Sequence, residues 1–232
     1  MKLEKLTKKN LELKRWYDDA CGTAHALELV GERWSLLIMR EMMFGPRRFG
    51  DIRAALPGIS ANVLTQRLET LEGHGIVVRS KLPPPASVQV YGLTPWGYEA
   101  DQLLIVLGNW AARSPGHDPT LPLSKTSLML SFRTMFQADV AGDRVVTVGF
   151  VLGEETFRVR VENGTLTPRR AEIDDADVVF DTTPEAMAGY VYGKVPLDAM
   201  EEAGAIVVQG DRNAALRFQT WFILPPKAEK PL

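Results

Sequence analysis

Residues 57–75, with the sequence PGISANVLTQRLETLEGHG, decide the fold of this 232-residue chain. The proline and glycine at its start favour a turn, and Ser60 suits the N-cap of a helix because its hydroxyl accepts a hydrogen bond from a first-turn amide. Apolar residues recur at helical spacing and predict one buried stripe: Leu64, Leu68 and Leu71. The sequence therefore predicts a helix over about 61–73, ended by the glycines that follow.

The neighbouring segments predict a helix on one side of this element and a β-hairpin on the other. A short helix is expected over about 49–56. Residues 76–79 and 88–91 are β-branched or alternating and predict two paired strands. Three consecutive prolines between them predict a projecting loop, because proline has no amide hydrogen for a sheet. Two short helices joined by a tight turn and followed by a hairpin are the layout of a winged helix-turn-helix.

The side of the 61–73 helix opposite the leucines has the chemistry that duplex DNA requires. An amide side chain can form two hydrogen bonds with adenine in the major groove, which indicates Asn62 and Gln66. Arginines at the entry to the first short helix suit a phosphate. The predicted DNA contacts are Arg47, Arg48, Ser60, Asn62, Thr65, Gln66, Arg67, Arg79, Lys81 and Ser87. Arg67 lies near the leucine stripe, so it either supports the fold or touches a phosphate from the side.

A set of motifs, in order along residues 15–113, resembles the HxlR-type bacterial transcriptional regulators. The motifs are Cys21, Leu27-Glu28-Leu29-Val30-Gly31, Trp34, Gly45-Pro46-Arg47-Arg48-Phe49, Ile59-Ser60 and Tyr91-Gly92-Leu93-Thr94-Pro95-Trp96-Gly97. The resemblance implies a homodimer whose two recognition helices enter successive major grooves of a palindrome-like, double-stranded operator. It also implies dimer contacts through the first helix and residues 96–113. From the residues themselves, one helix is expected from Thr94-Pro95 to about Arg113.

The segment 114–122 contains three prolines and a glycine and predicts an extended linker. We expect a DNA-binding and dimerisation domain over 1–113 and a second domain over 123–226, an α+β architecture in total. In the second domain the motifs Glu162-Asn163-Gly164-Thr165-Leu166 and Ile206-Val207-Val208-Gln209-Gly210-Asp211 resemble a sterol carrier protein-type domain.

That second resemblance implies an apolar cavity between a sheet and its helices. The candidate ligand-binding residues are Phe132, Met135, Phe136, Met187, Tyr190 and Met200. Taken singly, each of them fits a core as well as a cavity, because methionine and aromatic side chains fill gaps in either setting. A domain that has lost the cavity and serves in dimer contact is the alternative.

The charges are nearly balanced over the whole chain, with 27 basic and 29 acidic residues, which excludes a protein coated in basic charge. Residues 1–114 have a net charge of +3, from 15 basic and 12 acidic residues, whereas residues 115–232 have −5, from 12 and 17. A nucleic acid is therefore expected to meet the first half. No apolar run approaches the ~18 residues of a membrane span, so we expect a cytoplasmic protein without membrane contact.

The lone cysteine and the three histidines are the residues to consider for redox sensing, metal binding or catalysis. Cys21 precedes a predicted helix, so it is either an oxidant-sensing thiol or a small buried apolar residue. The three histidines show no metal-ligand spacing, and the chain lacks the common nucleophile and phosphate-loop motifs. We therefore expect no enzyme, metal or cofactor, but a DNA-binding transcriptional regulator that responds to a small hydrophobic ligand. The alternatives are a lipid or hydrophobic-ligand carrier and a redox-sensing regulator acting through Cys21.

Overall fold

The structure, a computed structural model, describes residues 17–83 and 87–229. The chain divides into two compact units between Leu104 and Ile105. This division lies inside a helix, ahead of the proline-rich segment 114–122, which is part of the second unit. The expected domain limits at 113 and 123 stay predictions. Among the described residues, no helix combines the length and the apolar character needed to cross a bilayer.

From residue 17 to the hairpin, the first unit contains α1 (Gly22–Val30), α2 (Ser35–Glu41), α3 (Phe49–Ala55) and α4 (Ala61–Gly73). Helix α4 begins and ends where the sequence predicts. The hydroxyl of Ser60 accepts a hydrogen bond from the amide of Val63 at 3.2 Å, an N-cap that typically stabilises a helix by about 1 kcal/mol. Leu64, Leu68 and Leu71 of α4 are buried, as are Ile38 of α2 and Ile52 of α3, and α4 packs against α2 and β1.

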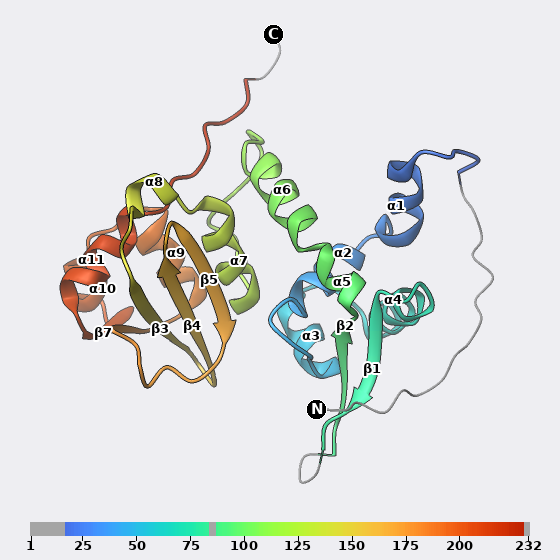
Figure 1. The fold of residues 1–232 in the computed structure, drawn as a ribbon, viewed down its shortest axis with the longest axis horizontal. Helices are drawn as coiled ribbons and strands as arrows, with labels where there is room; N and C mark the ends of the chain where they lie inside the picture. The colour runs from blue at the N-terminus through green and yellow to red at the C-terminus, as the bar shows by residue number, and fades with distance from the viewer. Residues whose placement is uncertain (1–16, 84–86, 230–232) are drawn as a thin grey trace. The chain divides into compact units, whose positions relative to one another are not determined.

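Strands β1 (Val77–Lys81) and β2 (Gln89–Leu93) form the expected antiparallel hairpin, in which Arg79 pairs with Tyr91. Figure 1 shows the hairpin extending away from α3 and α4. Arg47 adds a short third segment to it, because its backbone amide and carbonyl both bond Tyr91 at 2.8 Å. The entry to α3 is therefore fixed to the hairpin by backbone hydrogen bonds.

The predicted helix from residue 95 to 113 is wrong in one respect, since the structure has two helices, α5 (Pro95–Glu99) and α6 (Asp101–Ala112). They separate at Ala100, whose amide bonds Gly97 in a tighter turn. Gly97 also allows α5 to lie against the hairpin, because a Cβ there would be 2.3 Å from the carbonyl oxygen of Ile76. Nearby, the hydroxyl of Thr94 caps α5 and donates to the carbonyl of Gly75 at 2.8 Å.

The second unit is a five-stranded sheet covered by helices. Its strands are β3 (Val146–Leu152), β4 (Glu155–Glu162), β5 (Thr165–Arg170), β6 (Val178–Thr182) and β7 (Ile206–Gly210), in the order β5-β4-β3-β6-β7. Only β3 and β6 are parallel. The predicted turn at Asn163-Gly164 joins β4 to β5, and both residues have positive φ angles, as a two-residue hairpin turn of this kind requires.

The helices of the second unit are α7 (Lys125–Met135), α8 (Ala138–Ala141), α9 (Pro184–Val191), α10 (Leu197–Glu202) and α11 (Arg212–Thr220). Figure 1 shows α7, α9 and α11 on one face of the sheet. The core between these layers is aromatic. The ring of Phe218 on α11 lies 5.3 Å from that of Phe132 on α7 and 5.7 Å from that of Phe150 on β3, measured between centroids. The fold class is thus α+β, as expected.

Candidate nucleic-acid interface and pocket

Helix α4 presents the amide side chains to solvent. Asn62, Thr65 and Gln66 are exposed, while Leu64 and Leu68 are buried on the opposite side. Ser60 is exposed as well, although its hydroxyl already serves as the N-cap. The two amides lie four residues apart, about one helical turn, so both fit one groove at the same time.

Two of the predicted contacts bind acidic side chains of the protein itself. The guanidinium of Arg67 lies 2.6 Å from the carboxylate of Glu32, and its Nε donates to the carbonyl of Arg33 at 3.2 Å. Arg79 on β1 lies 3.5 Å from the carboxylate of Glu72 on α4. These pairs join α4 to the turn before α2 and to the hairpin, which favours a supporting role for Arg67.

The remaining basic residues border α3 and the hairpin. Arg48 is the N-cap residue of α3 and is exposed, while Arg47 is half-buried beside Tyr91. Arg53 on α3 is also exposed, a further cation that the sequence analysis did not single out. Lys81 and Ser87 are exposed on the two arms of the hairpin. Residues 84–86, at the predicted projecting loop, lie outside the described residues.

Cys21 is exposed at the N-cap of α1. The backbone amides of Thr23 and Ala24 at this helix end lower the pKa of its thiol, because an amide dipole stabilises the thiolate. The alternative that Cys21 is a small buried apolar residue is wrong, because the side chain is exposed. Redox sensing stays a prediction.

The predicted ligand-binding residues lie in or beside the aromatic core. Phe132, Met187 and Tyr190 are fully buried, and Met135 is nearly so, whereas Phe136 and Met200 are half-buried. The hydroxyl of Tyr190 donates to the carbonyl of Ala215 at 2.8 Å. The ring of Phe132 lies 5.6 Å from that of Phe150 and 5.3 Å from that of Phe218, measured between centroids, and the role of these residues in ligand binding stays a prediction.

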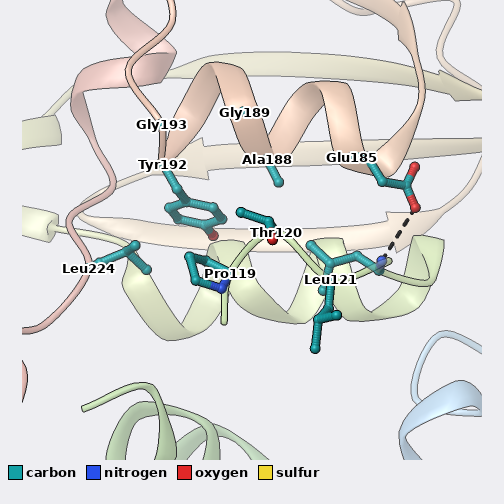
Figure 2. A pocket seen from close by; sticks show the side chains of 10 residues that line it. Pro119, Thr120, Leu121, Glu185, Ala188, Gly189, Tyr192, Gly193 and Leu224 are labelled. Carbon is teal, nitrogen blue, oxygen red and sulfur yellow. Dashed lines mark hydrogen bonds between the residues drawn. The ribbon is translucent and has the colours of Figure 1, made fainter. Parts of the chain in front are cut away.

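A pocket of about 320 Å³ lies elsewhere in the second unit, between α9 and the proline-rich segment. Figure 2 shows Leu121 and Thr120 on one side, Ala188 of α9 and Tyr192, the residue that follows α9, on the other, and Leu224 at one end. Glu185 lies at the opposite end and accepts a hydrogen bond from the amide of Leu123 at 3.4 Å. None of the six predicted ligand residues lines this pocket.

The pocket could not be predicted from the sequence, because its lining comes from a proline-rich segment and from a helix that lie far apart in the chain. The prolines of the 114–122 segment indicate an extended conformation but not what that segment packs against. The start of α9 is marked by Thr183-Pro184, which indicates a helix end and not a cavity. Within the described parts of the chain, the structure also groups no three His, Cys, Asp or Glu side chains that could hold a metal ion.

Comparison with known proteins adds family relationships to this geometry. Residues 29–118 match the model of the HxlR-like helix-turn-helix family, and residues 124–227 match a model described as the alkyl sulfatase C-terminal segment. The HTH-type transcriptional regulator YvaP of Bacillus subtilis is 36% identical over 86 residues, which are 37% of this chain and 80% of YvaP. The HTH-type transcriptional regulator YodB of the same species is 37% identical over 86 residues, covering 77% of YodB.

An HTH-type transcriptional regulator of Synechocystis is 40% identical over 87 residues, and this chain spans 64% of its length. Among solved structures, the reduced form of YodB is 33% identical and covers 43% of this chain and 100% of its own, with a TM-score of 0.38. A sec-alkyl sulfatase, PisA1, is 18% identical and covers 55% of this chain and 21% of its own, with a TM-score of 0.40.

The first unit is thus a winged helix-turn-helix in its elements and their order. With relatives above 30% identity that are covered over more than two thirds of their length, the chain belongs to the HxlR-like helix-turn-helix family. The α+β class of the second unit is as expected, while its likeness to sterol carrier proteins stays a prediction.

Proposed function

We propose that the protein is a sequence-specific, DNA-binding transcriptional regulator. The observation that carries the proposal is the exposed amide-bearing side of α4, held on a winged helix-turn-helix by its buried leucines. An α-helix fits the major groove, where side chains reach the base edges. The family relatives named above are HTH-type transcriptional regulators, which supports the same conclusion.

The contacts divide into two roles. Asn62 and Gln66 read bases, because an amide offers a donor and an acceptor to adenine at once. Arg48 and Lys81 bind phosphates and give affinity without sequence preference. Arg67 positions α4 through its pair with Glu32 and does not read a base.

A homodimer is the second part of the proposal. An apolar stripe on α6 is exposed in the single chain: Leu103 is 42% exposed, Val106 64%, Leu107 36% and Trp110 73%. A contiguous exposed apolar stripe of this kind indicates a protein interface. Association of two copies through α6 buries the stripe and pairs two recognition helices, which then require half-sites about 34 Å apart.

Selection from a pool of randomised duplexes tests this function. The full-length protein is incubated with the pool, bound duplexes are recovered and sequenced, and the process is repeated at rising salt concentration. We expect enrichment of an inverted repeat whose half-sites are about one helical turn apart. Recovery of unrelated sequences at every salt concentration would show that α4 does not read bases.

A redox-sensing regulator is the second candidate, favoured by the exposure of Cys21 and the lowered pKa of its thiol. Alkylation by iodoacetamide measures the reactivity directly. We expect a rate above that of a free cysteine at pH 7, and an operator affinity that changes on treatment with hydrogen peroxide in the wild type but not in Cys21→Ser. An ordinary alkylation rate and an unchanged affinity would exclude this candidate.

Residues 124–227 match a model described as the C-terminal segment of alkyl sulfatases. We propose that the second unit binds a small apolar molecule and has no reaction of its own. Copurification of such a molecule, detected by mass spectrometry of natively purified protein, supports this assignment. Hydrolysis of an alkyl sulfate by the purified chain would overturn it.

A further inference from the structure

The polar side chains of the pocket at α9 all present hydrogen-bond acceptors. The hydroxyl of Tyr192 donates its hydrogen to Ser131 at 2.7 Å, and that of Thr120 donates to Asp118 at 2.7 Å. Each oxygen therefore keeps only lone pairs for a bound molecule. Glu185 contributes a carboxylate, which is also an acceptor. Burial raises the pKa of Tyr192, so this side chain stays a neutral phenol.

The rest of the lining is apolar, from Leu121, Ala188 and Leu224 among others. A volume of about 320 Å³ lies at the lower end of the range for pockets that hold small molecules, which is about 300–1,000 Å³. The second half of the chain has a net charge of −5, a field that favours cations. The pocket is thus apolar, surrounded by acceptors and acidic at one end.

We propose that this pocket binds a small apolar molecule that carries an ammonium group, with Glu185 as the counter-ion. The apolar part of the molecule lies against Ala188 and Leu224, and the ammonium group lies at the end formed by Glu185 and the residue 120–123 segment. This site differs from the cavity that the sequence predicts, because none of the six predicted ligand-binding residues lines it.

The pocket also has a direct structural connection to α6. The C-terminal segment that supplies Leu224 continues along the end of α6: the amide of Ala228 donates to the carbonyl of Arg113 at 2.7 Å, and the ammonium group of Lys227 donates to that of Ala112 at 3.0 Å. The same ammonium group donates to the carbonyl of His117 at 3.2 Å. Both chain segments that wall the pocket are therefore attached to the end of α6 or continuous with it.

We infer that occupation of the pocket changes operator affinity through α6. We expect a molecule that separates the 119–123 segment from α9 also to displace the neighbouring carbonyl of His117, to which Lys227 is bonded. Lys227 bonds Ala112 at the end of α6 as well, and α6 carries the proposed dimer stripe. This step rests on the proposed function, because it needs a dimer whose two recognition helices have an adjustable spacing. The molecule must bind the two spacings with different affinity, since only a differential affinity shifts an equilibrium.

Calorimetric titration of the full-length protein tests the binding step. The probes are 2-phenylethylamine and tryptamine, each compared with its carboxylate analogue, 3-phenylpropionate or indole-3-propionate. We expect an amine to bind and its carboxylate analogue to fail. Glu185→Gln keeps the side-chain shape and should weaken amine binding by about tenfold or more, equivalent to about 1.4 kcal/mol. Glu202→Gln, on the exposed side of α10, is the matched control and should leave amine binding unchanged.

A second variant fills the pocket and does not depend on charge. Ala188→Leu places a larger side chain in the pocket, and we expect it to abolish amine binding while thermal unfolding shows a folded protein. If this variant does not fold, the comparison of Glu185→Gln with Glu202→Gln still decides the question. Failure of both amines to bind at millimolar concentration, or equal binding of their carboxylate analogues, would overturn the assignment.

Fluorescence anisotropy with a labelled duplex, taken from the selection described above, tests the coupling. We expect a saturating amine to change operator affinity by about fivefold or more, the usual scale of coupling between sites. Amine binding without any change in operator affinity would refute the coupling and leave the site in place. An unliganded protein that binds no duplex would refute the proposed function instead, while the calorimetric result on the pocket would stand.

Discussion

The guanidinium of Arg67 and the carboxylate of Glu32 lie 2.6 Å apart and join the middle of the recognition helix to the turn before α2. A second bond, from Arg67 Nε to the carbonyl of Arg33 at 3.2 Å, fixes the plane of the guanidinium. An arginine held by two acceptors has lost its freedom to follow a DNA backbone. The pair instead joins α4 to the turn before α2.

The first prediction concerns this pair. Arg67→Ala should lower the free energy of unfolding by about 1 kcal/mol, the upper end for a partly exposed ion pair, and should leave base preference unchanged. Urea unfolding and a comparison of selected operator sequences check the two parts. In a double-mutant cycle with Glu32→Ala, the two effects should not add. A changed base preference would mean that Arg67 contacts bases.

Gln66→Ala should relax the preference for one base pair in each half-site. Loss of a two-bond contact with a base costs about 1–3 kcal/mol at that position and nothing at the others. Binding titrations against operators with single substitutions measure the effect. Gln209→Ala, on an exposed strand position of the second unit, is the matched control. An unchanged profile for Gln66→Ala would remove this residue from the set of base contacts.

Arg48→Ala should weaken binding to all duplexes alike. The loss of one phosphate contact reduces the slope of log affinity against log salt by about 1. Affinity measured across a salt series on both operator and random DNA checks this expectation. Arg169→Ala removes an exposed arginine from β5 and should leave the slope as it is. A loss confined to the operator would instead assign base reading to Arg48.

Val106→Asp should separate the dimer. A charge in the middle of the α6 stripe loses its water on association without gaining a partner, which strongly disfavours the interface. Sedimentation equilibrium should show a monomer for this variant and a dimer for the wild type. Val145→Asp introduces the same charge at another exposed valine and serves as the control. A wild-type monomer at all concentrations, or a dimeric Val106→Asp, would contradict the α6 interface.

Asp211 should make stability depend on pH in the acid range. Its carboxylate accepts hydrogen bonds from the amides of Ala214 at 3.1 Å and Asn213 at 2.8 Å, and these bonds lower its pKa in the folded state. The stabilisation is therefore complete above the unfolded-state pKa of about 3.9 and is lost as the pH falls through the lower folded-state value. Thermal unfolding of the wild type between pH 2 and pH 6, compared with Asp211→Ala and the control Asp143→Ala, checks this. Parallel pH profiles for all three proteins would contradict it.

The sequence predicted the approximate limits of α4 because three independent signals agree there: the Ser60 cap, the leucine spacing and the terminal glycine. For α6, the sequence offers no such set of agreeing signals to show what its apolar side contacts. An apolar stripe on a helix is the same pattern whether it faces the chain's own core or a second chain, so sequence alone could not show that Val106 and Trp110 are exposed.

In the second unit, the pattern of turns and strands was predictable, as the Asn163-Gly164 hairpin shows. Whether the interior holds a cavity or a packed core was not predictable. Phe132 suits a cavity wall and a filled core equally, and only the distances between rings distinguish them. The pocket at Glu185 depends on a proline-rich segment folding back onto α9, a long-range contact that leaves no local periodicity in the sequence.

The close approach of Gly97 to Ile76 has a consequence for protein engineering. One added methyl group at residue 97 would collide with the backbone carbonyl of Ile76, so α5 and the start of the hairpin must move apart while every side chain proposed to touch DNA keeps its chemistry. Gly97→Ala is therefore a way to vary wing placement by itself and to learn how much of operator discrimination comes from geometry and how much from functional groups.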